Sequence, residues 1–195
     1  TDEGGKARID LDHARVSAAL TQFDHARILG PGPMMTGRYQ GERLGACTDC
    51  RRLWGNYRAG DLDESDMNEV TGRLAPTIGT CMVMGTASTM ACMTEAMGMM
   101  LPGGATIPAV NADRLRAAEQ TGQRAVEMAA NGPRPSEVLN PDAFRNALVT
   151  LQAIGGSTNA VIHLLAMAGR VGVDLTLDDW DRLGRDVPTI VNLMP

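Results

Sequence analysis

One cysteine lies in a glycine-rich stretch that runs directly into a predicted helix. Cys81 lies four residues before Gly85, where we expect that helix to begin. Its first turn would carry three hydroxyl side chains, those of Thr86, Ser88 and Thr89. Backbone N–H groups and hydroxyls at a helix start suit an anionic oxygen, and a cysteine close by is biased towards the metal-ligating thiolate. The stretch is a candidate anion or metal site, although a buried cysteine beside a well-capped helix would give the same pattern.

A second glycine-rich turn occurs downstream, where residues 155–159 are Gly-Gly-Ser-Thr-Asn. Such a turn before a helix could bind a phosphate or a carboxylate, which makes Thr158 and Asn159 candidate binding residues. The turn lacks the lysine of a P-loop and the third glycine of a dinucleotide fingerprint, and helix capping alone also explains Ser157 and Thr158. We expect the helices that start near Thr86 and Thr158 to point towards a shared cleft. His163, in the second of these helices, is expected to be a core histidine rather than a base.

Cys47 and Cys50 have the spacing of a redox-active or metal-binding cysteine pair. Thr48 could place them at a helix N-terminus, as thioredoxin-like chemistry requires. The sequence has no second Cys or His pair at zinc-site spacing, which argues against a closed zinc site. We expect two ordinary cysteines in a helix. A redox protein that used the pair would lose its thiol–disulfide activity on Cys47→Ser, and we expect no such activity to be detectable.

Helices dominate the elements that must position these residues. Caps, glycines and prolines predict helices over residues 9–23, 48–60, 63–70, 86–100, 112–130, 141–154 and 158–168, with a last one from Thr176. Residues 77–81 are predicted to be a strand end or a loop, and residues 187–193 a buried strand. Helices with short strands between them indicate the α/β class. Four methionines spaced along one helical face are expected to pack in the core: Met90, Met93, Met97 and Met100.

Composition narrows the class of protein further. The 195 residues are enough for one domain or a large piece of one, and 44% hydrophobic residues allow a sizeable core. A net charge of −5 without a basic run argues against nucleic acid as a partner. No apolar stretch is long enough to span a membrane. Four cysteines do not make a disulfide scaffold in a chain of this length, so we expect a reducing, cytoplasmic setting.

Several short motifs in a fixed order resemble the dihydroxy-acid dehydratase and phosphogluconate dehydratase family. They are Gly-Pro-Met at 32–34, Gly-Thr-Cys at 79–81, Met-Gly-Thr-Ala-Ser-Thr-Met at 84–90, Glu-Ala-Met-Gly at 95–98, Leu-Pro-Gly at 101–103, Gly-Gly-Ser-Thr-Asn-Ala at 155–160, Val-Pro at 187–188 and Val-Asn-Leu at 191–193. The resemblance runs from about residue 30 to residue 195. The motif at 84–89 is more similar to the aldonic-acid branch, which includes arabinonate, xylonate and gluconate dehydratases.

The resemblance implies a hydro-lyase that converts a 2,3-dihydroxy acid or sugar acid into a 2-keto acid. It implies an iron–sulfur cluster of the two-iron or four-iron type, held by three cysteines, and a Mg²⁺ ion that holds the substrate carboxylate. Cys81 matches the third cluster cysteine, and this chain contains none of the family's catalytic residues. The expected partner is a small dihydroxy or aldonic acid, and the parent enzyme is expected to be a homo-oligomer. The candidate substrate-binding residues are Thr86, Ser88, Thr158 and Asn159.

The sequence also departs from the family pattern. The family's Cys-Asp-Lys motif, which supplies the second cluster cysteine and Mg²⁺ ligands, is absent, and its expected place lies near residues 8–10. The first cluster cysteine would lie further upstream, and the last Glu ligand and the serine base in a C-terminal half. We therefore expect an internal piece of a longer enzyme, inactive alone, with a divergent segment at 1–29 and a partial N-terminal iron–sulfur domain at 30–195. The alternative is a catalytically dead remnant or binding module without a cluster; a Cys-Asp-Lys motif in the upstream coding sequence would decide for the enzyme.

Overall fold

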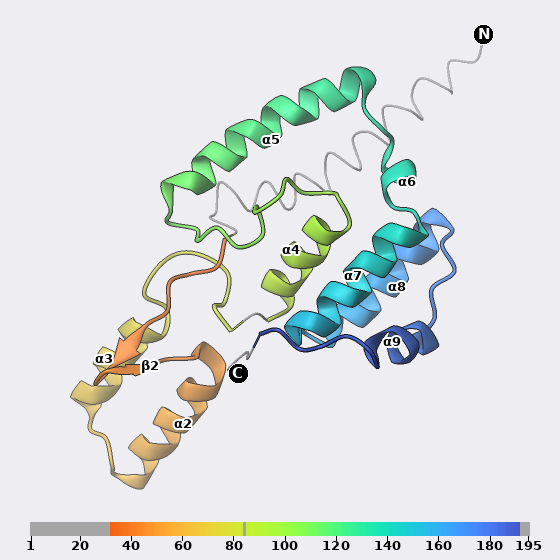
Figure 1. The fold of residues 1–195 in the computed structure, drawn as a ribbon. Helices are drawn as coiled ribbons and strands as arrows, with labels where there is room; N and C mark the ends of the chain where they lie inside the picture. The colour runs from red at the N-terminus through yellow and green to blue at the C-terminus, as the bar shows by residue number, and fades with distance from the viewer. Residues whose placement is uncertain (1–31, 84, 192–195) are drawn as a thin grey trace.

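Helices make up most of the computed structural model, which describes residues 32–83 and 85–191 (Figure 1). The predicted helix at 9–23 and the segment at 1–29 lie outside the described residues. In chain order the elements are β1 (Arg38–Tyr39), β2 (Glu42–Arg43), α2 (Ala46–Ala59), α3 (Glu64–Leu74), α4 (Thr86–Ala96), α5 (Ala112–Asn131), α6 (Pro135–Val138), α7 (Pro141–Ile154), α8 (Asn159–Val171) and α9 (Leu177–Gly184).

The sheet of the described part of the chain is small. β1 and β2 form an antiparallel hairpin in which Arg38 pairs with Arg43, and one isolated parallel bridge joins Pro33 to Thr80. The fold is therefore helix-rich with a two-stranded sheet, and it carries fewer strands than the α/β prediction implied. The strand predicted at 187–193 is wrong for residues 187–191, which have no regular structure. Ile190 is 72% exposed there, and its N–H donates to the Ala153 carbonyl rather than to a neighbouring strand.

The described residues pack around two separate cores. A small lobe contains the hairpin, α2 and α3, whose buried side chains include Leu44, Leu53 and Val70. A larger lobe contains α4, α7, α8 and α9, with α7 packed along α4 (Figure 1). The long helix α5 lies at the edge of the molecule (Figure 1).

Three of the four methionines predicted for the core lie in the core of the larger lobe, whereas the fourth, Met100, is partly exposed and lies outside it. Met93 is fully buried, and Met90 and Met97 are nearly so. The helix α4 ends at Ala96 rather than near Met100, because Gly98 takes a left-handed backbone with φ of +81° directly after the cap at Met97.

Capping residues set most of the helix starts where the sequence placed them. Asp63 and Asp66 form a capping box at α3, and Thr176 with Asp179 forms one at α9. Asn140 caps α7, with Pro141 in the first turn, and Asn111 caps α5.

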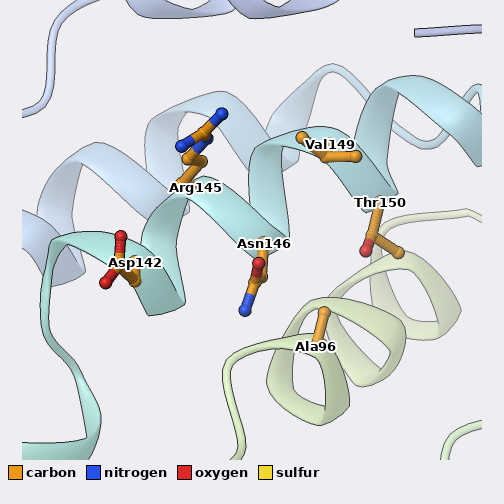
Figure 2. A pocket seen from close by; sticks show the side chains of 6 residues that line it. All are labelled: Ala96, Asp142, Arg145, Asn146, Val149 and Thr150. Carbon is orange, nitrogen blue, oxygen red and sulfur yellow. The ribbon is translucent and has the colours of Figure 1, made fainter.

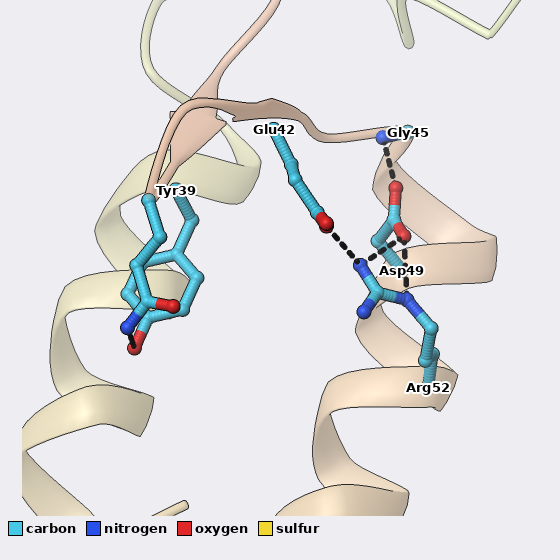
Figure 3. A network of polar contacts seen from close by, with 6 residues as sticks. Tyr39, Glu42, Gly45, Asp49 and Arg52 are labelled. Atoms are coloured by element: carbon cyan, nitrogen blue, oxygen red, sulfur yellow. Dashed lines mark hydrogen bonds and ion pairs between the residues drawn. The ribbon is translucent and has the colours of Figure 1, made fainter.

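The start of α2 differs from the prediction. Gly45 is the N-cap, so Thr48 lies inside the helix and does not cap it. No side chain caps the first turn, but Asp49 Oδ2 accepts the N–H of Gly45 at 2.5 Å, and Arg52 joins Asp49 to Glu42 of the hairpin (Figure 3).

We expect the core of the larger lobe to carry most of its stability. Leu148 of α7 is 1% exposed, whereas its neighbour Val149 is 37% exposed. Leu148→Ala should lower the free energy of unfolding by roughly 2–5 kcal/mol because it leaves a cavity. Val149→Ala should change it by no more than about 0.5 kcal/mol. Urea unfolding followed by circular dichroism measures both, and equal effects would contradict this packing.

Tyr39 should titrate at unusually high pH. Its hydroxyl donates to Asp66 Oδ1 at 2.7 Å, and this bond, with desolvation and nearby carboxylates, raises the pKa of Tyr39 from 10.0 to about 12. The bond's contribution to stability is complete below pH 10 and is lost as the pH rises through 12. In a Tyr57→Phe background, where Tyr39 is the sole tyrosine, tyrosinate absorbance should show this pKa, and Asp66→Asn should lower it. Titration near pH 10 with Asp66 intact would show that the bond is not formed in solution.

Candidate functional site

The loop that carries Cys81 is fixed by pairing with the Gly-Pro-Met segment at 32–34. The Met34 N–H donates to the Thr80 carbonyl at 2.8 Å, and the Thr80 N–H donates to the Gly32 carbonyl at 2.9 Å. Gly79 has a φ of +135°, and a Cβ there would lie 2.5 Å from the Met34 nitrogen. The close approach therefore requires glycine at this position.

Cys81 lies in coil and is partly exposed, before the helix that begins at Thr86, as the sequence predicted. The buried Ser88 holds this loop against the helix. Its hydroxyl donates to the Cys81 carbonyl at 3.3 Å and lies 3.0 Å from the Thr80 hydroxyl. Ser88 thus orients the backbone beside the cysteine.

The start of α4 lies against the turn that leads into α8. The Thr86 hydroxyl lies 3.1 Å from the Ser157 hydroxyl and accepts the Asn159 side-chain amide at 2.9 Å. The buried Thr89 hydroxyl accepts the Ser157 N–H at 3.0 Å. A Cβ at Gly156 would lie 2.7 Å from Thr89 Cγ2, so the contact has no room for a side chain there. Two helix starts that are 73 residues apart in sequence, measured from Thr86 to Asn159, therefore meet.

The backbone N–H groups in the first turns of α4 and α8 differ in their hydrogen-bond partners. At α8, the Ser157 hydroxyl accepts the Asn159 N–H at 3.3 Å, while Thr158 and Asn159 themselves are exposed. At α4, the N-cap is Gly85, and no side chain caps the first turn. Backbone N–H groups in that first turn are suited to an anionic oxygen. The two starts meet, as expected, whereas the shared cleft and an acidic ligand that bridges the starts stay predictions.

The other three cysteines of the described chain lie outside the Cys81 loop. Cys92 sits in α4 and packs against the core, where burial, with Glu95 adding to it, raises the pKa of its thiol. Cys47 and Cys50 belong to α2 in the small lobe.

Residues 32–83 and 85–191 contain no group of three or more His, Cys, Asp or Glu side chains that could hold a metal ion. These residues do not by themselves fit an iron–sulfur cluster or a Mg²⁺ site. Cys81 could supply one ligand at most.

His163 is exposed, so the prediction of a core histidine is wrong. The helix α8 buries Ala160, Leu164 and Ala168, which recur every four residues along one face. His163 falls on another face beside Ile162, which is 68% exposed.

Two further residues, Glu95 and Arg114, form hydrogen bonds with the backbone of neighbouring loops and were not predicted from the sequence. Both oxygens of Glu95 accept backbone N–H groups, from Gly103 at 2.6 Å and from Ala105 at 2.8 Å. Arg114 is 7% exposed and donates to the Ile107 carbonyl at 2.6 Å. The position of Glu95 in the Glu-Ala-Met-Gly motif could have indicated its role, whereas nothing in the sequence distinguishes Arg114 from other charged residues of an amphipathic helix.

An open groove of about 600 Å³ runs along the exposed side of α7 near the end of α4 (Figure 2). It is lined by Ala96, Asp142, Arg145, Asn146, Val149 and Thr150. None of the predicted site residues lines it, so it is distinct from the contact between α4 and α8.

Comparison with known proteins defines the family. Residues 16–195 match the family described as dihydroxy-acid/6-phosphogluconate dehydratase, N-terminal, and the chain belongs to it. The chain is 54% identical to the L-arabinonate dehydratase of Rhizobium leguminosarum bv. trifolii (strain WSM2304) over 84% of its own length and 28% of that enzyme's. It is 49% identical to the L-arabonate dehydratase of Azospirillum brasilense, over 87% of this chain and 29% of that one.

Identity is lower to a relative from the other branch. The dihydroxy-acid dehydratase of Thermodesulfovibrio yellowstonii (strain ATCC 51303 / DSM 11347 / YP87) is 39% identical over 87% of this chain and 31% of its own length. These identities support the aldonic-acid branch within the family. The chain spans less than a third of the length of each of these relatives. Within the described residues, no helix is long and apolar enough to cross a membrane.

Thr89 should be the residue on which the contact between the helix starts depends most. Thr89→Val keeps the side-chain shape but leaves the Ser157 N–H without its acceptor, which should cost about 1–3 kcal/mol of unfolding free energy. Thr89→Ser keeps the hydroxyl and loses one methyl group, which should cost about 0.5–1.5 kcal/mol. Chemical unfolding compares the two variants. A Thr89→Val variant at least as stable as Thr89→Ser would show that the hydroxyl does not hold the turn.

Proposed function

We propose that this chain is the cluster-bearing N-terminal part of a hydro-lyase that converts an aldonic acid into its 2-keto acid. The observation that carries the proposal is the meeting of the α4 start with the α8 start, next to the loop that holds Cys81. Loss of the C2 proton and the C3 hydroxide gives an enol, which rearranges to the 2-keto acid. Membership of the dehydratase family supports this class of reaction.

The residues at the two helix starts would bind and orient the acid. The uncapped N–H groups of the first turn of α4 are suited to a carboxylate oxygen. The Thr86 hydroxyl and the exposed Thr158 and Asn159 can exchange their present contacts for hydroxyl groups of a sugar acid. Ser88, already bonded to the Cys81 loop, would keep that loop in place while the substrate binds.

Cys81 would be one of three thiolates that hold an iron–sulfur cluster. Its partial exposure and its place in a loop before a helix support this role. The other two thiolates, and most ligands of the Mg²⁺ ion, would come from parts of a longer protein. We further propose that this protein works in the cytoplasm as a homo-oligomer.

An aldonic acid is favoured over a branched dihydroxy acid as the substrate class. Two arabinonate-type relatives are 54% and 49% identical to this chain, against 39% for a dihydroxy-acid dehydratase. The alternative, a remnant that only packs or binds, is not favoured by these similarities. The longer protein should therefore form a 2-keto acid from a five-carbon aldonic acid faster than from a branched 2,3-dihydroxy acid, and the reverse order would contradict the choice of branch.

Cluster content tests the role of Cys81. In the longer protein, reconstituted without oxygen, Cys81→Ala should abolish both the visible absorbance of the cluster and the dehydration, because one thiolate is lost. Cys92→Ala is the matched control and should keep the cluster, since that thiol packs against the core. Iron and sulfide analysis gives the stoichiometry.

The 195-residue chain should bind no stoichiometric cluster, because its described residues bring together no group of three or more side chains that could hold a metal. A stable cluster in this chain, or one that survives Cys81→Ala in the longer protein, would show that the ligands are misassigned.

A further inference from the structure

We propose that Cys47 and Cys50 form a reversible oxidation site, at which the two thiols close to a disulfide by exchange with a low-molecular-weight disulfide such as glutathione disulfide. The site lies in the small lobe and does not depend on the proposed dehydratase function. It also differs from the activity of a redox protein, because the chain itself is oxidised and no protein substrate is turned over.

The start of α2 brings the two thiols onto one face of the helix. Cys47 and Cys50 lie in the first two turns, three residues apart. In an α-helix such residues have Cα atoms about 5 Å apart, within the range that a disulfide spans. Cys47 is exposed and Cys50 is half-buried, so a small disulfide can reach the first thiol from solvent.

The residues around the pair hold this turn in place. Asp49 lies between the two cysteines, and its carboxylate accepts the Gly45 N–H at 2.5 Å and the Arg52 guanidinium at 2.9 Å (Figure 3). Arg52 also reaches Glu42 at 3.4 Å, which ties the helix start to the hairpin. These contacts keep both cysteines on the same two helical turns before any bond forms, so that attack within the chain competes with a second intermolecular exchange.

The exchange proceeds in two balanced steps. The Cys47 thiolate attacks one sulfur of glutathione disulfide, which forms a mixed disulfide and releases one glutathione thiolate that takes up a proton. The Cys50 thiolate then attacks the Cys47 sulfur and releases the second glutathione. The two cysteines are oxidised and one glutathione disulfide is reduced to two thiols.

Closure should strain the helix start, which makes the bond easy to reverse. Cβ atoms three residues apart in a helix are about 5–6 Å apart, whereas a disulfide brings them to about 4 Å. The first turn must therefore tighten against the Asp49 contacts. Strained and exposed disulfides are the readily reduced ones.

Neither of the other two cysteines has a second cysteine within one helical turn of it in the sequence. Cys81 lies in the loop before α4, and Cys92 packs against the core of the larger lobe with the pKa of its thiol raised by burial. The pair on α2 is therefore the site at which we expect a bond within the chain.

Alkylation and intact mass test the proposal on the 195-residue chain. After incubation with glutathione disulfide, the chain should lose two hydrogen atoms and two of its four alkylatable thiols. Peptide mapping should join Cys47 to Cys50, and dithiothreitol should restore all thiols. Circular dichroism of both forms shows whether the helices persist.

Three variants make the result specific. A Cys81→Ser, Cys92→Ser double variant should oxidise like the parent chain, whereas Cys50→Ser should stop at a glutathione adduct on Cys47. Asp49→Ala, which removes the contacts against which the first turn must tighten, should raise the oxidised fraction of the pair at a given ratio of glutathione disulfide to glutathione. Four thiols that remain alkylatable, a stable glutathione adduct in the parent chain, or a bond between other cysteines would each overturn the proposal.

Discussion

The hydroxyl of Thr89 is fully buried and accepts the backbone N–H of Ser157 at 3.0 Å, across 68 residues of sequence. A buried N–H without an acceptor is costly, so this bond fixes where the turn before α8 can lie. The preceding residue must be glycine, because Thr89 and Leu151 occupy the space that a side chain at Gly156 would need. With the turn fixed, the Thr86 hydroxyl and the Asn159 amide come within 2.9 Å of each other. The other polar contacts of the candidate site thus depend on the hydrogen bond from Ser157 to Thr89.

The cysteine loop depends on a second constraint of the same kind. Two backbone hydrogen bonds join Thr80 to the segment at 32–34, and the close approach excludes any side chain at Gly79. Ser88 then links this loop to α4 through the Cys81 carbonyl. The same helix therefore organises the loop on one side and the α8 turn on the other. This arrangement explains why the polar side chains of Ser88 and Thr89 are buried in α4.

Local signals in the sequence predicted the features that depend on a few neighbouring residues. The helix starts at Asp63 and Thr176 and the Asn-Pro start of α7 are of this kind, as is the loop position of Cys81. The motifs also led to the family, which the comparisons confirm.

Features that depend on residues distant in the sequence could not be predicted from the sequence. The bond from Ser157 to Thr89 joins two motifs, and neither motif indicates the atoms that meet. His163 was assigned to the core because its helix is apolar, but the direction of the buried face is set by packing on α4 and α7. The predicted start of α2 lay three residues too late: the helix begins after Gly45, whose N–H donates to the Asp49 carboxylate inside the helix, and no side chain caps the first turn.

Steady-state kinetics of 2-keto acid formation by the longer protein test most directly whether the two helix starts bind the acid. Asn159→Ala removes an exposed amide at the meeting point, and His163→Ala is the control one turn further along α8, also exposed. A hydrogen bond between neutral groups, such as the Asn159 amide and a substrate hydroxyl, contributes about 0.5–1.5 kcal/mol, so Asn159→Ala should lower kcat/KM roughly two- to tenfold with the cluster intact, while His163→Ala should leave it unchanged. An Asn159→Ala enzyme that keeps the parent kcat/KM would contradict the assignment of this contact as the substrate site.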